Sequence, residues 1–500
     1  MISEAFRLPL RTVAPAWQGH LKRAGSVSVA AVLVGGLALA PQAQAQYTAQ
    51  FVPPPTEGQP AGMITPFALN NRGQVFARNF WGGASPDRGP VLSTNGVTVA
   101  LPMPTGYHFV DSQAASLLND LGVAVSTVQL DSATGAGGVR PVIWHNGAAT
   151  VLPVPMDLAG CASRYNFEPP PYTEEKFSVL PVGLNRAGHV LILACNTLWI
   201  VDSSGSVIVA GPPPADVPPS GLQPVYFADL NSGGNHLNDA DVASAQTGLP
   251  GVPELIHPGI LSGGLSSFFP LPLDYGNAKG INNRNQQLAF FPSPPVSTTY
   301  YCRLWTGTTL ADLGICGTTA LNDLGQVAFM TSGNQPRLYK DGVVNEITLP
   351  PEVPGLLFSG GSGLNDAGQI IGEYGSSGVL LTPSGPCAAD ATSQTVVRRG
   401  RLRYDATTQH YTQAVVVRNK GTSTLAGPIS VALDNVPATA TLFNLNGATS
   451  CNAPAGSFYL DLPVASLAPG ARTTGTLEFI DPTAAGITYG TRVFVGAGRR

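Results

Sequence analysis

Charged residues are scarce in this 500-residue chain: Asp, Glu, Lys and Arg make up 11% of it, against about a quarter in a typical globular domain. The sequence also lacks a Gly-x-Ser-x-Gly elbow, a phosphate loop, a His-Glu-x-x-His pair and a dinucleotide fingerprint, so no familiar catalytic motif assigns an activity. Gly and Pro are abundant, with 58 and 45 copies, which favours short strands joined by tight turns. A hydrophobic content of 43% excludes wholesale disorder.

Cysteine is also rare, with six copies and no Cys-x-x-Cys pair. The spacings match no zinc site, and an even number of cysteines in an exported chain favours disulfides. Six cysteines allow fifteen pairings, of which we expect the sequential one. The predicted pairs are Cys161 with Cys195, Cys302 with Cys316, and Cys387 with Cys451.

Long hydrophobic runs are missing except near the N-terminus. Lys22 and Arg23 precede an apolar run over residues 27–40, and Ala43-Gln44-Ala45 follows as a small-x-small cleavage site. This order predicts a secretory signal peptide over residues 1–45, with an uncleaved anchor as the alternative. The long region before Lys22 leaves open a translation start downstream of Met1. The mature chain is expected in the extracellular space or the periplasm, without a membrane span.

The strongest feature of the sequence is an internal repeat. Seven segments share Leu or Ile, Asn, two variable residues, and then Gly or a substitute. The repeated asparagines are Asn70, Asn119, Asn185, Asn238, Asn282, Asn322 and Asn365. The fourth position holds Gly73, Gly122, Gly188, Asp241, Asn285, Gly325 and Gly368. These residue types accept positive φ most readily, so each unit predicts a tight turn inside a β-hairpin.

A second hairpin follows in each copy, at turns such as Asn95-Gly96 and Asp341-Gly342. Two hairpins give four strands per repeat, the content of one propeller blade. We therefore predict an all-β chain in which residues 46–387 close into a seven-bladed β-propeller. The last copy stops at Ser384-Gly385 without an outer strand. Residues 47–53 are expected to supply that strand, with Phe51 near Val379.

The phrase Leu-Asn-x-x-Gly-Gln-Val, followed by an apolar strand ending in Trp, resembles the extracellular HAF repeat family over roughly residues 60–385. The match is good at Asn70, Asn322 and Asn365 and weaker where Asp241 and Asn285 replace glycine, and the His-Ala-Phe tripeptide that names the family is absent. The resemblance implies an exported bacterial repeat protein without an assigned activity. It supplies no catalytic residues.

The repeat stops near Ala388, where the charge changes sign. Residues 46–387 hold 12 Lys and Arg against 23 Asp and Glu, whereas residues 388–500 hold 10 against 6. Short strand-like runs separated by turns predict an immunoglobulin-like β-sandwich over residues 388–500. Arg399, Arg401 and Arg403 alternate, which places them on one strand face. They would either contact an anionic surface or form a solvated edge that discourages sheet pairing.

Aromatic side chains outside the common repeat frame are the candidate binding residues. Trp81 stands outside that frame, and the longest insertion carries Tyr165 and Tyr172. Long loops on one propeller face are where binding surfaces form, so residues 156–178 are the predicted contact region.

Other motifs have structural explanations. Trp144, Trp199 and Trp305 share one repeat position, which favours packing between blades over stacking on sugars. The oxygen-rich segment at residues 238–241 lacks the spacing of a calcium loop and coincides with a repeat turn. We therefore predict no metal and no cofactor.

These observations predict a secreted or surface-exposed binding or scaffold protein whose partner is a glycan or a protein at the cell surface. The alternatives are a glycan-cleaving hydrolase or lyase with a site at the propeller axis, and a structural component of the envelope. Two carboxylates or a His–Tyr pair meeting at the axis would favour the enzyme. No nucleic-acid partner is expected, because the mature chain is net negative and exported.

Overall fold

A computed structural model of the chain describes residues 45–55, 62–80, 89–110, 116–133, 138–153, 179–194, 197–210, 225–227, 234–249, 252–263, 265, 267–270, 276–292, 300–406, 408–481 and 486–500. These ranges contain many strands, no α-helix, and a 3-10 turn at Thr392–Gln394. The protein is therefore all-β, as the sequence predicts. Nowhere in the described ranges is there a helix with the length and apolar character needed to span a bilayer.

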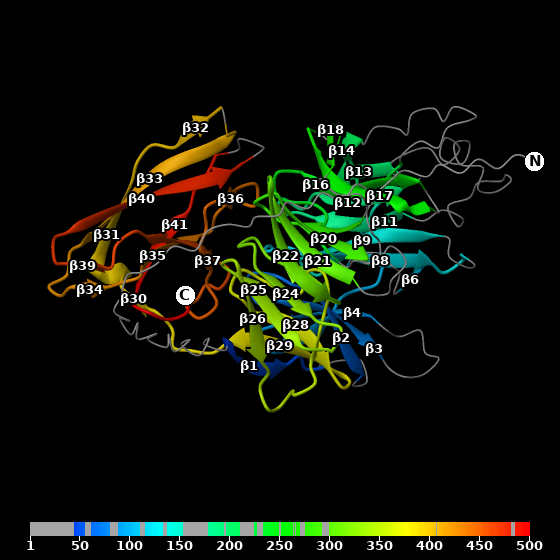
Figure 1. The fold of residues 1–500 in the computed structure, drawn as a ribbon, viewed down its shortest axis with the longest axis horizontal. Coiled ribbons are helices and arrows are strands. Elements are labelled where there is room, and N and C mark those ends of the chain that lie inside the picture. The colour runs from blue at the N-terminus through cyan, green and yellow to red at the C-terminus, as the bar shows by residue number, and fades with distance from the viewer. Residues whose placement is uncertain are drawn as a thin grey trace, which may run out of the picture. The chain divides into compact units, whose positions relative to one another are not determined.

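The first five repeats form separate antiparallel sheets, most of whose strands are labelled in Figure 1. The first sheet contains β2 (Met63–Leu69), β3 (Val75–Phe80), β4 (Pro90–Thr94) and β5 (Val97–Ala100). The second contains β6 (Tyr107–Phe109), β7 (Leu117–Leu118), β8 (Ala124–Leu130), β9 (Val139–His145) and β10 (Ala148–Val151). The third contains β11 (Val179–Leu184), β12 (Val190–Ala194), β13 (Thr197–Val201) and β14 (Val207–Ala210).

The fourth and fifth sheets repeat this four-strand order. The fourth contains β15 (Val225–Phe227), β16 (Ala243–Leu249), β17 (Val252–Ser262) and β18 (Ser267–Pro270). The fifth contains β19 (Asn277–Ile281), β20 (Gln286–Pro292), β21 (Tyr300–Thr306) and β22 (Thr309–Cys316).

The last two repeats share the first strand of the described chain. The sixth repeat contains β23 (Thr319–Leu321), β24 (Val327–Met330), β25 (Pro336–Lys340) and β26 (Val343–Thr348). The seventh contains β27 (Leu357–Phe358), β28 (Ile370–Tyr374) and β29 (Ser377–Pro383). Strand β1 (Ala45–Phe51) pairs antiparallel with β29, placing Phe51 opposite Val379. A short parallel contact also joins β1 to β26.

The turn predicted between the first two strands of a repeat is confirmed in all seven copies. The fourth residue of the motif has a positive φ in each copy, from 56° at Asp241 to 86° at Gly188. The second turn also matches its sequence at Asn95-Gly96, where both residues have positive φ. That conformation produces a two-residue hairpin whose twist suits the flanking strands.

The repeat sheets bury their apolar side chains against the sheets of neighbouring repeats. Phe76 of the first repeat and Trp144 of the second share one cluster. Another cluster joins Ile64 of the first repeat to Ile371 and Leu380 of the seventh. The first and last repeats therefore pack together although they are far apart in the sequence.

The C-terminal region forms two five-stranded sheets and a short two-stranded one. One large sheet contains β30 (Ala389–Asp390), β41 (Gly490–Val495), β35 (Ile429–Asp434), β38 (Phe458–Leu462) and β37 (Gly447–Ala448). The other contains β31 (Thr395–Arg399), β32 (Arg403–Asp405), β33 (His410–Asn419), β40 (Arg472–Ile480) and β36 (Thr441–Leu442). The short sheet pairs β34 (Leu425–Ala426) with β39 (Ser466–Leu467). Val415 and Phe479 from one large sheet and Val431 and Phe458 from the other belong to one buried core.

Candidate functional site

The repeated asparagine organises its own turn. Asn70 Oδ1 accepts hydrogen bonds from the backbone N–H groups of Arg72 (3.1 Å) and Gln74 (3.0 Å). Asn70 Nδ2 donates to Gln74 Oε1 (2.8 Å) and to the backbone oxygen of Asn119 in the next repeat (2.9 Å). An amide carries both the acceptor and the donors that this arrangement needs, and the residue is buried. This dual role explains why Asn recurs at this position.

The same amide links each repeat to the next. Nδ2 donates to the backbone oxygen of the following motif asparagine in the pairs Asn70–Asn119 (2.9 Å), Asn119–Asn185 (3.0 Å), Asn238–Asn282 (3.2 Å), Asn282–Asn322 (2.9 Å), Asn322–Asn365 (2.9 Å) and Asn365–Asn70 (2.9 Å). Asn185 Nδ2 instead donates to Asp241 Oδ1 of the next repeat (2.8 Å). Because Asn365 bonds back to Asn70, the links form a closed circuit.

A glutamine after the turn supplies a second acceptor in four repeats. Its Oε1 accepts from the motif Nδ2 at Gln74 (2.8 Å), Gln286 (2.7 Å), Gln326 (2.9 Å) and Gln369 (2.8 Å). His189 and Val242 occupy this position in the third and fourth repeats. There the acceptors are Asp241 and Asn285 (both 2.8 Å), the fourth motif residues of the following repeats.

In three of the four repeats that have this glutamine, the glycine at the fourth position of the following repeat leaves room for it, at Gly73, Gly122 and Gly325. A Cβ at Gly325 would lie 2.4 Å from Gln286 Oε1, so the Gln286 side chain would have to move and give up the hydrogen bond that it accepts from Asn282 Nδ2. Asp241 and Asn285 follow two of the three repeats that lack this glutamine, those with His189 and Val242, and in both a side chain replaces the missing acceptor. The second repeat has Val123 at this position and is followed by Gly188; there Asn119 Nδ2 donates to the backbone oxygens of Asn185 (3.0 Å) and Arg186 (3.4 Å).

The residues that follow the motif asparagines form a second circuit, which we call the axial ring. It consists of Asn71, Asp120, Arg186, Asp239, Asn283, Asp323 and Asp366. A backbone N–H of one member donates to a side-chain oxygen of the next at Asn71–Asp120 (2.8 Å), Arg186–Asp239 (2.7 Å), Asp239–Asn283 (2.7 Å), Asn283–Asp323 (2.8 Å), Asp323–Asp366 (2.9 Å) and Asp366–Asn71 (2.7 Å). The step to Arg186 breaks the pattern, because a guanidinium has no acceptor.

Every carboxylate oxygen of the axial ring accepts a hydrogen bond. Besides the backbone donors above, side-chain donors reach the second oxygens at Asn71–Asp120 (3.0 Å), Asn71–Asp366 (2.8 Å), Asn283–Asp323 (2.8 Å) and Asn283–Asp239 (2.9 Å). Asn71 and Asn283 therefore each join two carboxylates. The four ring acids are therefore held by hydrogen bonds from neighbouring ring members, which indicates a structural role.

Burial raises the pKa of three ring carboxyls. The pKa of Asp366 rises to about 7 because burial disfavours its charged form. Burial raises the pKa of Asp323 as well, and repulsion from Asp366 adds to the effect. Burial also raises the pKa of Asp239 and lowers the pKa of the Arg186 guanidinium. These directions favour a ring that retains a proton near neutral pH.

The C-terminal region bonds directly to the axial ring. The Arg186 guanidinium donates to the backbone oxygens of Ala440 and Val436 (2.9 Å to the latter) and lies 4.8 Å from the Phe458 ring centroid. The Thr441 hydroxyl donates to Asp239 Oδ2. Arg284, two residues after the motif asparagine Asn282, adds a further contact, since its Nη2 donates to the backbone oxygen of Leu445 (2.8 Å).

A cavity of about 130 Å³ lies among the motif residues of the seven repeats. Its lining is rich in carboxyl and amide groups, including Asp120, Asp239, Asp323 and Asp366. A volume of this size corresponds to a few water molecules, whereas pockets for small organic ligands usually measure about 300–1,000 Å³. The axial ring can hold water or a proton but has little room for a sugar ring.

The candidate aromatic residues give no test of the predicted contact region. Trp81, Tyr165 and Tyr172 lie outside the described residues, and so does the whole of the predicted contact region, residues 156–178. Two of the tryptophans at the shared repeat position, Trp144 and Trp305, lie in the core as predicted, and Trp199 is partly buried. Trp144 and Trp305 are 1% and 2% exposed, and Trp199 packs against a buried cluster.

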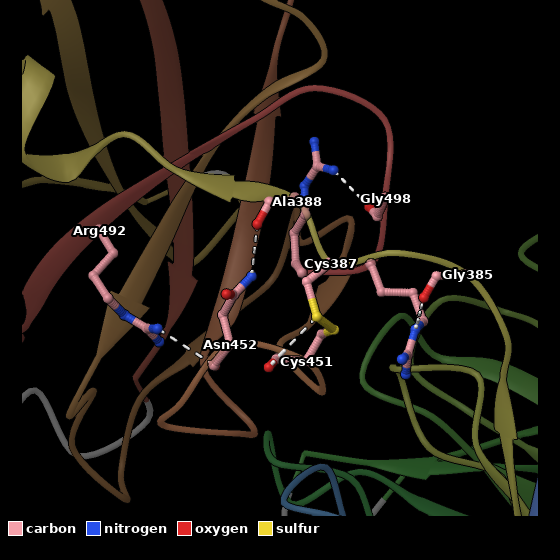
Figure 2. Close-up of a disulfide and its surroundings, with 9 residues drawn as sticks. Gly385, Cys387, Ala388, Cys451, Asn452, Arg492 and Gly498 are labelled. Atoms are coloured by element: carbon pink, nitrogen blue, oxygen red, sulfur yellow. Dashed lines mark hydrogen bonds between the residues drawn. A yellow bond between two sulfur atoms is a disulfide. The ribbon is translucent and has the colours of Figure 1, made fainter.

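Two of the three expected disulfides are confirmed. Cys302 pairs with Cys316 between strands β21 and β22, and Cys387 pairs with Cys451. Figure 2 shows the second pair, where the Nδ2 of neighbouring Asn452 donates to the backbone oxygen of Ala388 (3.2 Å). This disulfide joins the segment that leaves the seventh repeat to the C-terminal region. Cys161 and Cys195 lie outside the described residues.

The motif defined from the sequence does not identify the axial ring, because it treats the residue after each asparagine as variable. Six of the seven residues there are nevertheless Asp or Asn, and Arg186 is the exception. These are the residues with a short side chain that carries an acceptor oxygen. That shared property is the signal that could have identified the ring.

The arginine pattern of the C-terminal region also differs from expectation. Arg399 Nη1 donates to the backbone oxygen of Tyr489 (2.7 Å), and its guanidinium lies 4.8 Å from the Tyr489 ring centroid. Arg399 lies opposite Val415 of β33 and Arg403 lies opposite Thr412; these two β33 positions are three residues apart, so they point to opposite faces of the sheet. The prediction that the three arginines share one strand face is therefore wrong for Arg399.

No family model matches the chain, and no curated protein matches it either. Among solved structures, it is similar to the β-propeller domain of the Trilobed protease from Pyrococcus furiosus, with 9% identity and a TM-score of 0.39 over 65% of this chain and 96% of that one. It is also similar to Pyrococcus horikoshii acylaminoacyl peptidase, with 11% identity and a TM-score of 0.36 over 72% of this chain and 58% of that one. A Bacteroides ovatus protein titled xyloglucan PUL GH43B shows 11% identity and a TM-score of 0.23, over 90% of this chain and 97% of that one.

Proposed function

We propose that residues 46–387 close into a seven-bladed β-propeller and that residues 388–500 form an immunoglobulin-like β-sandwich. The closed circuit of motif asparagines supports the propeller, because its last link runs from Asn365 to Asn70. The cluster that joins Ile64 to Ile371 supports the same closure. The single core between the two large C-terminal sheets supports the sandwich.

We propose that the chain is related to the HAF repeat family, whose shared phrase has a physical explanation in this chain. In the phrase Leu-Asn-x-x-Gly-Gln, the Asn forms the turn, the Gln accepts its amide, and the Gly makes room for the glutamine of the previous repeat. The phrase is thus a set of mutually dependent contacts. Two disulfides also support export, since disulfides persist in oxidising compartments.

We propose that the protein is a secreted or periplasmic binding or scaffold protein, with a glycan or a protein at the cell surface as its partner. The observation that supports this most is the state of the axial carboxylates. All of them accept hydrogen bonds from neighbouring repeats, and Asp239 is also bonded by Thr441 of the C-terminal region. A group that holds the fold together at both oxygens is poorly placed to attack a substrate, so binding is assigned to the outer surfaces.

A glycan-cleaving hydrolase is the second candidate. Four carboxyls converge on one small cavity, and burial raises the pKa of Asp366 to about 7, which suits a general acid. The cavity of about 130 Å³ is too small for a sugar unless the contacts of Arg186 and Thr441 open.

The proposal is tested by screening the mature chain on a glycan array and in pull-downs against envelope extracts, with product analysis by mass spectrometry on the same glycans. We expect a bound partner and no cleavage. Glycan cleavage that disappears in D366N would establish the hydrolase instead. Absence of any bound glycan or protein would overturn the binding proposal.

A further inference from the structure

The sheet that contains β31, β33 and β40 has one buried and one open face. Val415, Val417, Leu477 and Phe479 point into the core between the two large C-terminal sheets. Side chains alternate along a strand, so the intervening residues point the other way. This opposite side, which we call the basic face, displays Val396, Arg398, Val416, Arg418, Arg472, Thr474 and Thr476.

Strand register brings the arginines of the basic face together. Arg418 lies directly opposite Arg472 across the β33–β40 pair, and Arg398 lies opposite Val416, one row away on the same face. All three arginines are exposed. Within the described part of the chain, their side chains have no ion pair and no hydrogen bond. Like charges directly opposite each other destabilise a sheet, so the unliganded face retains a repulsion that an anion would relieve.

The rows that carry these arginines hold no acid; register also places Arg403 and Asp405 of β32 on this side of the sheet, opposite Thr412 and His410 further along β33. The positions beside the arginines hold Thr474 and Thr476 on β40, and the next outward residue is Glu478. Glu478 is already engaged, because its Oε1 lies 2.7 Å from His410 Nδ1. The remainder of the sequence carries the opposite charge, since residues 46–387 hold 23 acidic against 12 basic residues. Residues 388–500 hold 10 basic against 6 acidic residues, and three of those ten basic residues stand in these rows of the face.

We propose that the basic face binds an acidic polysaccharide, an inference that rests on the proposed binding function and specifies its partner. Guanidinium groups match carboxylate and sulfate oxygens in forked pairs. Arg398, Arg418 and Arg472 stand on three adjacent strands, which are about 4.8 Å apart, so successive acidic groups of an extended chain can meet them. A membrane surface fits less well, because interfacial binding needs a larger apolar area. Among the residues named for the basic face, Val396 is the one large apolar side chain that is exposed, at 38%.

Binding of polygalacturonate to the full mature chain tests the inference, with neutral dextran and phosphatidylglycerol vesicles as parallel probes. We expect polygalacturonate to bind at low salt and its affinity to fall with rising salt, while dextran does not bind. The R418Q/R472Q variant should bind at least about tenfold more weakly, since each lost contact to a polyanion costs several-fold. R337Q/K340Q removes the same two charges from β25 and should leave the affinity unchanged.

The possible outcomes separate this inference from the proposed function. Equal weakening in both double variants would show a net-charge effect and overturn the basic face as the site. Vesicle binding without polygalacturonate binding would assign the face to a lipid surface instead. A chain that captures a protein or a neutral glycan but no polyanion would overturn this inference and leave the proposed binding function standing. Far-ultraviolet circular dichroism of both variants checks that they fold.

Discussion

The asparagine that closes the circuit allows a quantitative test. Asn365 is 3% exposed and makes four hydrogen bonds, two through Nδ2, to Asn70 O and Gln369 Oε1, and two through Oδ1, from the backbone of Ala367 and Gln369. N365A removes all four and leaves their partners buried. At about 1 kcal/mol for each bond, the variant should lose about 4 kcal/mol of unfolding free energy.

This loss can be measured as a change in melting temperature. With an unfolding entropy of about 2.1 cal/mol/K per residue over residues 46–387, about 4 kcal/mol corresponds to a Tm about 6 °C lower. Calorimetry at a fixed scan rate measures it. The control N345A removes one bond, from Asn345 Nδ2 to Val343 O at 3.3 Å, and should shift the Tm by less than about 1 °C. Equal shifts in the two variants would refute the claim that the circuit stabilises the repeats.

Three further predictions follow from the same contacts. G188N should be tolerated, because nothing lies within 4 Å of a Cβ at Gly188, whereas G325N should lower the Tm by at least about 3 °C, because Gln286 occupies that space; similar melting temperatures would contradict the compensation between repeats. The pKa of Asp366 is raised to about 7 in the folded state, so its contribution to stability is complete below pH ~4 and is lost as the pH rises to ~7. The Tm of D366N should fall less over that interval than that of the native chain, and parallel curves would be inconsistent with a buried, titrating carboxyl. Replacing both cysteines of a pair by Ser should cost about 4 kcal/mol for Cys387–Cys451 and about 3 kcal/mol for Cys302–Cys316, since they close segments of 64 and 14 residues; thermal unfolding of both double variants checks the order.

Local turn chemistry was predictable from the sequence because single residues determine it. Gly, Asp and Asn at the fourth motif position accept positive φ, and the structure has positive φ at all seven. The buried environment of Trp144 also followed from its repeat position, because equivalent positions have equivalent surroundings. Both inferences required information from one repeat only.

Contacts between repeats were not predictable in the same way. The role of Asp241 depends on His189 standing where four of the repeats have Gln, and the two residues lie 52 positions apart. The axial ring depends on a neighbour in the following repeat, and the covering of Arg186 depends on Ala440 in another region of the chain. Similarly, the basic face appears only when strand register places Arg418 opposite Arg472.

The pairing of β1 with β29 has a consequence for biosynthesis. Ribosomes release the N-terminus first, yet Thr48 finds its partner Thr382 only 334 residues later. Until the seventh repeat has been made, β1 lacks its antiparallel partner β29, and the one earlier strand pairing that the described residues give it is the short parallel pairing with β26. The repeat region therefore stays open during most of its synthesis and closes late, when β1 pairs with β29.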